Sequence, residues 1–151
     1  MRFSTRGRYG VKAMFVLAQH FGQGPLPLNQ IAQDQGLSEA YLEQLVGELR
    51  KSGLVKSVRG SQGGYLLGKS PGQITVGDII RVLEGPIAPA DCVLDNETLD
   101  LCDRAGQCVT QLIWKRVRDS ITDVLDGITL ADMLTEADEL FAEEGQTQLE
   151  F

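Results

Sequence analysis

LNQIAQDQGLSEAYLEQLVGEL, residues 28–49, predicts two short helices joined by a glycine turn. Gly36 separates two helical stripes of apolar residues, and a glycine just past a helix can take a positive φ without a Cβ clash. Ser38 suits the N-cap of the second helix, and Glu39 lies in its first turn, where the helix dipole favours negative charge. The two stripes are Ile31, Ala32 and Gln35, then Leu42, Leu45, Val46 and Leu49. The pattern is typical of a DNA-binding helix-turn-helix, although an ordinary αα-hairpin fits these residues equally well.

The residues that follow indicate a β-hairpin. Residues 55–58 and 65–67 are predicted strands, and the tip between them, RGSQGG at residues 59–64, is predicted to be flexible. A hairpin directly after a recognition helix is a wing, and Arg59 at its tip could enter a minor groove. The hairpin therefore favours a winged helix over an αα-hairpin.

The two halves of the chain carry opposite charge. Residues 1–70 hold nine Lys and Arg against four Asp and Glu, and residues 71–151 hold five against seventeen. The first half, at +5, suits a phosphate-binding face, whereas the second, at −12, suits a solvated surface. Residues 132–151 hold seven acids and no Lys or Arg, which predicts a frayed tail.

The apolar runs are too short for a membrane segment. None reaches the roughly 18 residues of a span. Arginines before AMFVLA, residues 13–18, imitate a signal peptide, but Gln19 and His20 follow where small cleavage-site residues are expected. We therefore expect a cytoplasmic protein with no membrane partner, whose three cysteines stay reduced.

Helices are also predicted on either side of the winged helix. One covers about residues 8–21 and places on one face Val11, Met14, Phe15, Ala18 and Phe21. The loop GQGPLP follows it. Another helix has Thr75 as its cap and Asp78 at N3, and its predicted buried residues are Val76, Ile79, Ile80 and Leu83. The sequence ITLADML at residues 128–134 begins in a similar way.

A long amphipathic helix is predicted from about Cys108 to Asp126. The winged helix already has its own core, so this apolar face predicts a partner helix; twofold symmetry would bring two recognition helices to two half-sites. The expected fold is mostly α with a small β-hairpin wing, a winged helix-turn-helix plus a long dimerisation helix. The expected parts are the winged helix-turn-helix (1–72), a connecting helix (73–90), a cysteine loop (91–108), the dimerisation helix with a short helix after it (109–134) and an acidic flexible tail (135–151).

The three cysteines share one segment. Cys92, Cys102 and Cys108 give the spacing C-x9-C-x5-C among aspartates and glycine, which do not suit a core. In a reducing compartment such a group indicates metal binding or redox chemistry rather than a disulfide. Three thiolates could hold zinc or an iron-sulfur cluster, and either would need a fourth ligand.

Two features of the sequence could suggest an enzyme, but the residues around them do not support catalysis. Residues 63–70, GGYLLGKS, match the phosphate-loop pattern, but Tyr65 to Leu67 is itself a predicted strand and Pro71 prevents a helix from starting at Lys69. His20 is the only histidine, so no Ser–His or carboxylate–His set supports catalysis. An enzyme or electron carrier with a vestigial winged helix is thus the weaker alternative.

Three stretches together resemble the IscR-type iron-sulfur cluster regulators, winged-helix dimers whose relatives include NsrR and CymR. They are MRFSTRGRYGVKAM, then GLSEAYLEQLVGELRKSGLVKSVRGSQGGYLLGK, and CVTQLIW followed by DGITLADML. The likeness covers roughly residues 1–134. It implies a homodimer on a palindromic double-stranded DNA operator, with the long helix at the dimer interface, controlling cluster-assembly genes and its own promoter.

The resemblance also implies a 2Fe-2S cluster, with 4Fe-4S as the alternative, on Cys92, Cys102 and Cys108. The first spacing is longer than the C-x5-C of IscR. Gln111 occupies the position of the IscR histidine ligand, and Arg8 that of an aspartate which NsrR-like relatives take from the partner subunit. The fourth ligand therefore stays open among Gln111, Asp91, Asp95, Asp103 and a small exogenous molecule. The alternative is a CymR-like regulator of cysteine metabolism, controlled by a partner protein or thiol oxidation.

In the DNA-binding half, the positions that match residues the family uses at its operator are Tyr41, Glu43, Gln44 and Arg59. Further candidates for DNA contact are Ser38, Arg50 and Lys51. Gln44 can pair with adenine, whereas Glu43 can accept only from an amino group such as that of cytosine. Glu43 would therefore discriminate among operators, unless it simply lies on a solvated helix face.

Overall fold

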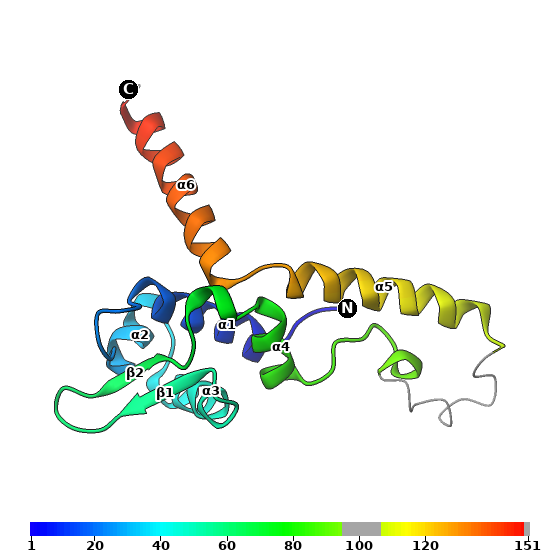
Figure 1. Cartoon of the computed structure of the whole chain (residues 1–151), viewed down its shortest axis with the longest axis horizontal. Helices are drawn as coiled ribbons and strands as arrows, with labels where there is room; N and C mark the ends of the chain where they lie inside the picture. The colour runs from blue at the N-terminus through cyan, green and yellow to red at the C-terminus, as the bar shows by residue number, and fades with distance from the viewer. Residues whose placement is uncertain (95–106, 150–151) are drawn as a thin grey trace.

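The computed structural model describes residues 1–94 and 107–149. Within them the elements are α1 (Thr5–Gln19), α2 (Leu28–Gln35), α3 (Glu39–Lys51), β1 (Val55–Val58), β2 (Gly64–Leu67), η1 (Pro71–Gln73), α4 (Val76–Glu84), η2 (Asp91–Val93), α5 (Val109–Asp126) and α6 (Leu130–Leu149). Helices α1 to α4 and the hairpin form one body, from which α5 and α6 extend in different directions (Figure 1). The predicted fold class, mostly helical with a small β-hairpin wing, is confirmed.

The helix-turn-helix forms where the sequence predicted it. Helix α2 ends at Gly36, which has a left-handed backbone at φ 63°. Ser38 then caps α3 by accepting a hydrogen bond from the backbone N–H of Tyr41 at 3.2 Å. The apolar stripe of α3 is fully buried, with 0% exposure at Leu42, Leu45, Val46 and Leu49. On α2, Ile31 and Ala32 are buried and Gln35 is half-buried.

The buried face of α1 differs from the prediction. Phe21 lies beyond the helix and is 51% exposed, and Phe15 is only half-buried. Met14 and Ala18 are buried as predicted, and the other buried residues of α1 are Gly7, Gly10, Ala13, Val16 and Leu17. A Cβ at Gly10 would collide with Leu83, and one at Gly7 with Glu84, so the two glycines let α4 lie directly on α1. The prediction placed large apolar residues inward and gave no weight to these small ones.

The wing is an antiparallel pair with Val55 opposite Leu67 and Val58 opposite Gly64. The loop GQGPLP contributes a third extended segment, because Leu26 and Tyr65 exchange two backbone hydrogen bonds of 2.9 Å. The sequence had predicted only a loop there. The phosphate-loop match at residues 63–70 falls on β2 and is followed by a 3-10 turn at Pro71–Gln73, and no helix begins at Lys69.

The similar sequences at the starts of α4 and α6 form similar caps. Thr75 and Asp78 cap each other's backbone N–H groups at 3.0 Å, and Thr129 and Asp132 do the same at 2.9 and 3.0 Å. The two starts also bond to each other, since Val76 N donates to Ile128 O and Leu130 N to Ile74 O, both at 2.9 Å. This antiparallel bridge holds the start of α4 next to the start of α6.

Helix α5 matches the predicted long helix, but the acidic flexible tail expected over residues 135–151 is wrong for most of its length. Helix α6 runs from Leu130 to Leu149. Residues 128–144 contain no Gly or Pro and are rich in Ala, Leu and Glu, which favour a helix in spite of the acidic charge. No described helix is long and apolar enough to span a membrane.

Candidate nucleic-acid interface and cysteine segment

The recognition helix α3 presents a polar face to solvent. Its predicted DNA-contact residues are exposed, namely Ser38, Glu43, Gln44, Arg50 and Lys51. Tyr41 is half-buried and is held from α1, because its hydroxyl lies 3.2 Å from Thr5 Oγ1 and its ring meets Tyr9 edge-on at 6.1 Å. The start of α3 is therefore fixed against α1, while its outer face is available to a ligand.

The end of α3 and the wing enclose a shallow hollow of about 550 Å³. Arg50 from α3 and Arg59 from the wing tip both line it. Arg50 Nη1 also donates to Ser57 Oγ on β1 at 3.4 Å, which ties the helix to the wing. The structure thus brings together two arginines that the sequence had placed on separate elements, in a hollow suited to a phosphate backbone.

The cysteine segment is fastened to α5 by two consecutive carbonyls. Gln111, only 5% exposed, donates from Nε2 to the carbonyl oxygen of Cys92 at 3.1 Å. Arg118 Nη1 donates to the carbonyl oxygen of Val93, also at 3.1 Å. Cys108 immediately precedes α5, and its Sγ lies 3.0 Å from Thr110 Oγ1. These bonds hold the Cys92 turn beside the first turns of the helix that Cys108 begins.

The predicted cluster ligands are only partly within the described residues. Cys92 and Cys108 are both half-buried, and Asp91 is exposed. Cys102, Asp95 and Asp103 lie outside the described residues. Among the residues that are described, no three His, Cys, Asp or Glu side chains gather as a metal site. Two half-buried thiols at one end of α5 nevertheless fit a sulfur-bound cluster or zinc in the chemistry of their donors.

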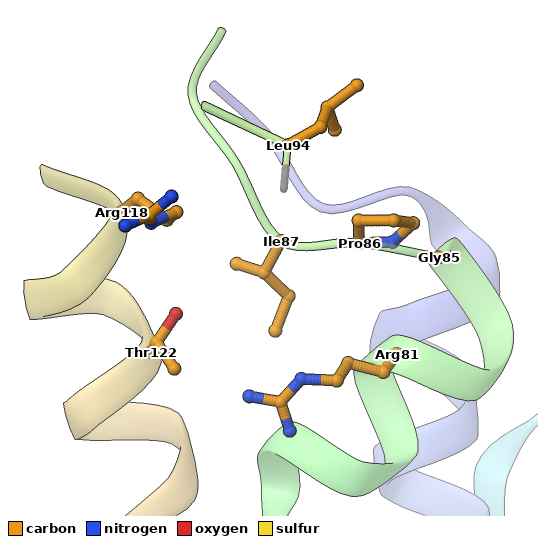
Figure 2. A pocket seen from close by; sticks show the side chains of 7 residues that line it. All are labelled: Arg81, Gly85, Pro86, Ile87, Leu94, Arg118 and Thr122. Carbon is orange, nitrogen blue, oxygen red and sulfur yellow. The ribbon is translucent and has the colours of Figure 1, made fainter. Parts of the chain in front are cut away.

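A cavity of about 570 Å³ lies between α4, α5 and the chain that leads to the cysteine turn (Figure 2). Arg81 reaches it from α4, and Arg118 and Thr122 from α5. Arg81 also makes a two-pronged pair with Asp126 at 2.8 and 2.7 Å; these hydrogen bonds raise the pKa of Arg81 and lower the pKa of Asp126. Sequence reasoning missed these arginines, because periodicity assigns polar residues to the surface without naming their partners.

Comparison with known proteins identifies the family. Residues 3–136 match the model of the Rrf2 family, described as "Iron-dependent Transcriptional regulator". The chain belongs to the Rrf2 family. The HTH-type transcriptional regulator CymR of Bacillus subtilis is 49% identical over 138 residues, which are 91% of this chain and 93% of that protein. IscR of Pectobacterium carotovorum subsp. carotovorum is 43% identical over 134 residues, 89% of this chain and 79% of that one.

Solved Rrf2 structures share the architecture. T. potens IscR matches with a TM-score of 0.76 and 55% identity, over 93% of this chain and 90% of that one. CymR of B. subtilis, titled the global cysteine regulator, matches with a TM-score of 0.75 and 49% identity, over 90% and 98%. The resemblance to IscR-type regulators is therefore confirmed, and this Rrf2 protein is a DNA-binding transcriptional regulator rather than an enzyme. Relatives named IscR and relatives named CymR both occur, so membership of the family alone does not identify the signal that this protein senses.

Proposed function

We propose that this protein is an iron-sulfur-cluster-sensing transcription regulator that controls cluster-assembly genes and its own promoter. The observation that carries the proposal is the hydrogen bond from Gln111 to the Cys92 carbonyl, which holds a cysteine-bearing turn next to Cys108 at the start of α5. The iron-dependent description of the family and the likeness to T. potens IscR support the same reading.

Three thiolates, those of Cys92, Cys102 and Cys108, would hold a 2Fe-2S cluster, with 4Fe-4S as the alternative. Such a cluster, when bound, supplies redox chemistry and sensitivity to oxygen. Gln111 donates its amide to a backbone carbonyl, so we assign it the role of positioning the turn. This leaves Asp91, Asp95, Asp103 or a small exogenous molecule as the proposed fourth ligand. Cluster occupancy would then be the signal that the protein reports.

We assign operator contacts to the exposed face of α3 and to the wing. Gln44 suits adenine, and Glu43 selects against phosphate and guanine edges, so both act in specificity. Arg50 and Arg59 share the hollow between α3 and the wing, where they would bind backbone phosphate or enter the minor groove. The remaining proposed contacts are Ser38, Tyr41 and Lys51.

The exposed apolar face of α5 supports a homodimer on a palindromic operator. The exposed apolar residues of this helix are Val109, Leu112, Ile113, Trp114 and Val124. An apolar face of this length on a helix that extends from the body is typical of a protein interface (Figure 1). A twofold pairing of α5 would present two recognition helices to the two half-sites of an operator. The protein would act in the cytoplasm.

The second candidate function is CymR-like regulation of cysteine metabolism through a partner protein or thiol oxidation. Two observations favour it. Gln111, a neutral amide, stands where IscR proteins have a histidine ligand. The 49% identity to B. subtilis CymR extends over almost the whole of that protein.

Anaerobic purification separates the two candidates. Iron, acid-labile sulfide and the visible absorption spectrum are measured for the wild type and for Cys102→Ala, with Thr122→Ala as a variant of α5 that keeps every cysteine. The sensor predicts about two irons and two sulfides per chain in the wild type and in Thr122→Ala, and loss of both in Cys102→Ala. Colourless wild-type protein that chemical reconstitution cannot fill would contradict the cluster and support the CymR-like function.

A further inference from the structure

One guanidinium joins three helices of the DNA-binding body. Arg6 lies in the first turn of α1, and its Nε donates to the carbonyl oxygen of Leu83 in α4 at 3.3 Å. Its Nη2 forms an ion pair with Glu48 of the recognition helix. The hydrogen bond to Glu48 raises the pKa of Arg6. A guanidinium is charged across the physiological range even without this shift. Arg6 therefore connects the last turn of α4 directly to α3.

The last turn of α4 leads into the cysteine segment. Gly85, at φ 84°, ends the helix, and seven residues separate Glu84 from Cys92. Ile87 within this short stretch and Val93 directly after Cys92 are both buried. The cysteine turn is held against α5 through the carbonyls of Cys92 and Val93. Because the connection from Glu84 to Cys92 is short, a movement of this turn relative to α5 would displace the end of α4.

Helix α1 cannot absorb such a movement by itself. Gly7 and Gly10 lie against Glu84 and Leu83 with no space for a Cβ, so α1 follows the last turn of α4. On its other side, α1 is bonded to the start of α3 through Thr5 and Tyr41. Closely packed elements of this kind transmit small displacements.

We propose that Arg6 is a positioning residue that couples the state of the cysteine segment to the placement of the recognition helix, through the Leu83 carbonyl and Glu48. This inference rests on the proposed function, in that the cysteines are taken as the sensor. It predicts that removing the Arg6–Glu48 ion pair reduces the difference in operator affinity between the protein with a cluster and the protein without one. A change of the same size in both affinities is not the predicted effect.

The test compares Arg6→Gln, Glu48→Gln and the double variant with a matched control, Arg81→Gln. Arg81 and Asp126 form an arginine–carboxylate pair with side-chain exposures of 39% and 40%, close to the 36% and 39% of Arg6 and Glu48, but this pair does not touch α3. For each protein, Kd is measured for a fluorescent duplex of the protein's own promoter, with and without the cluster. The readout is the ratio of the two Kd values.

We expect this ratio to move toward one by about two- to thirtyfold in both single variants. The double variant should lose no more than either single variant, because both remove the same pair. Arg81→Gln should keep the wild-type ratio. A wild-type ratio in Arg6→Gln and Glu48→Gln would overturn the proposal, and so would an equal loss in Arg81→Gln. Glu48→Gln preserves side-chain volume and answers the question alone if Arg6→Gln does not fold.

A second readout needs no cluster. In cluster-free protein, amide hydrogen exchange over residues 39–51 should be faster in Arg6→Gln than in Arg81→Gln or the wild type, and equal rates would contradict the linkage. Iron and sulfide are measured first, so that a wild type without a cluster counts against the proposed function only. In that case the Kd ratio is taken between reduced and iodoacetamide-treated protein, with the same expected and contradicting outcomes.

Discussion

The side chain of Gln111 donates a hydrogen bond to the backbone carbonyl of Cys92 at 3.1 Å, so α5 itself holds the turn that carries the first cysteine. The amide is buried, and its loss would leave a carbonyl without this donor. We therefore expect Gln111→Leu to destabilise the fold by about 1–3 kcal/mol. It should also make Cys92 react faster with a thiol reagent.

Thermal unfolding and labelling with iodoacetamide, located by peptide mass, test this expectation. Thr122→Ala on the same helix serves as the control and should change neither quantity. Unchanged stability together with unchanged Cys92 labelling in Gln111→Leu would show that the hydrogen bond does not hold the turn.

Arg59 at the wing tip should contribute mainly through phosphate charge. Arg59→Ala is expected to weaken operator binding and to reduce the slope of log Kd against log salt by about one. Arg116→Ala removes the same charge from an exposed position on α5, and should have little effect. Fluorescence anisotropy over a salt series provides the measurement. Equal affinity of Arg59→Ala and wild type at every salt concentration would count against the wing as a DNA contact.

The exposed apolar face of α5 should be the dimer interface. Val124 is 60% exposed, so an aspartate there costs little in the monomer but places two like-facing charges in a twofold interface. Val124→Asp is expected to shift the protein from dimer to monomer and to weaken binding to the two-half-site operator. Light scattering after gel filtration reports the mass, with Asp123→Asn as the neighbouring control. A dimer of unchanged stability in Val124→Asp would place the interface elsewhere.

The Arg81–Asp126 pair should make stability depend on pH in the acid range. Hydrogen bonding to Arg81 lowers the pKa of Asp126 in the folded protein, so its contribution is present above the unfolded pKa and is lost as the pH falls through the folded one. Both side chains are about 40% exposed, so the contribution at neutral pH is about 0–1 kcal/mol. The stability difference between wild type and Asp126→Asn should shrink below about pH 4, as measured by urea unfolding. A difference that grows on acidification would contradict the assignment.

Local sequence rules predicted the parts of the fold that local chemistry determines. The buried stripe of α3, the left-handed Gly36 and the Ser38 cap each depend on residues within one or two helical turns. The two Thr–Asp caps follow from the same kind of rule. The family resemblance then supplied the overall architecture and the candidate ligands, whose roles stay predictions.

The features that were missed depend on contacts between segments distant in sequence. The bridge of Leu26 to Tyr65 and the contact of Arg6 with Leu83 leave no local pattern. The small face of α1 was missed because Gly7 and Gly10 matter through what approaches them. The start of α6 was predicted, but its continuation beyond residue 134 was missed because the acidic charge there received more weight than the helix propensity.

The bridge that joins the starts of α4 and α6 has a consequence for how this family can diversify. Because Thr75 and Thr129 are paired, the chain returns after α5 to the point on the DNA-binding body where α4 begins. The stretch between the end of α4 and Thr129 is then an insertion whose two ends are anchored, one by α4 packed on α1 and the other by the bridge, and the closure entropy of such an insertion grows only slowly with its length. A longer cysteine loop, or one with different chemistry, can thus be exchanged between α4 and Thr129 while the winged helix is left intact.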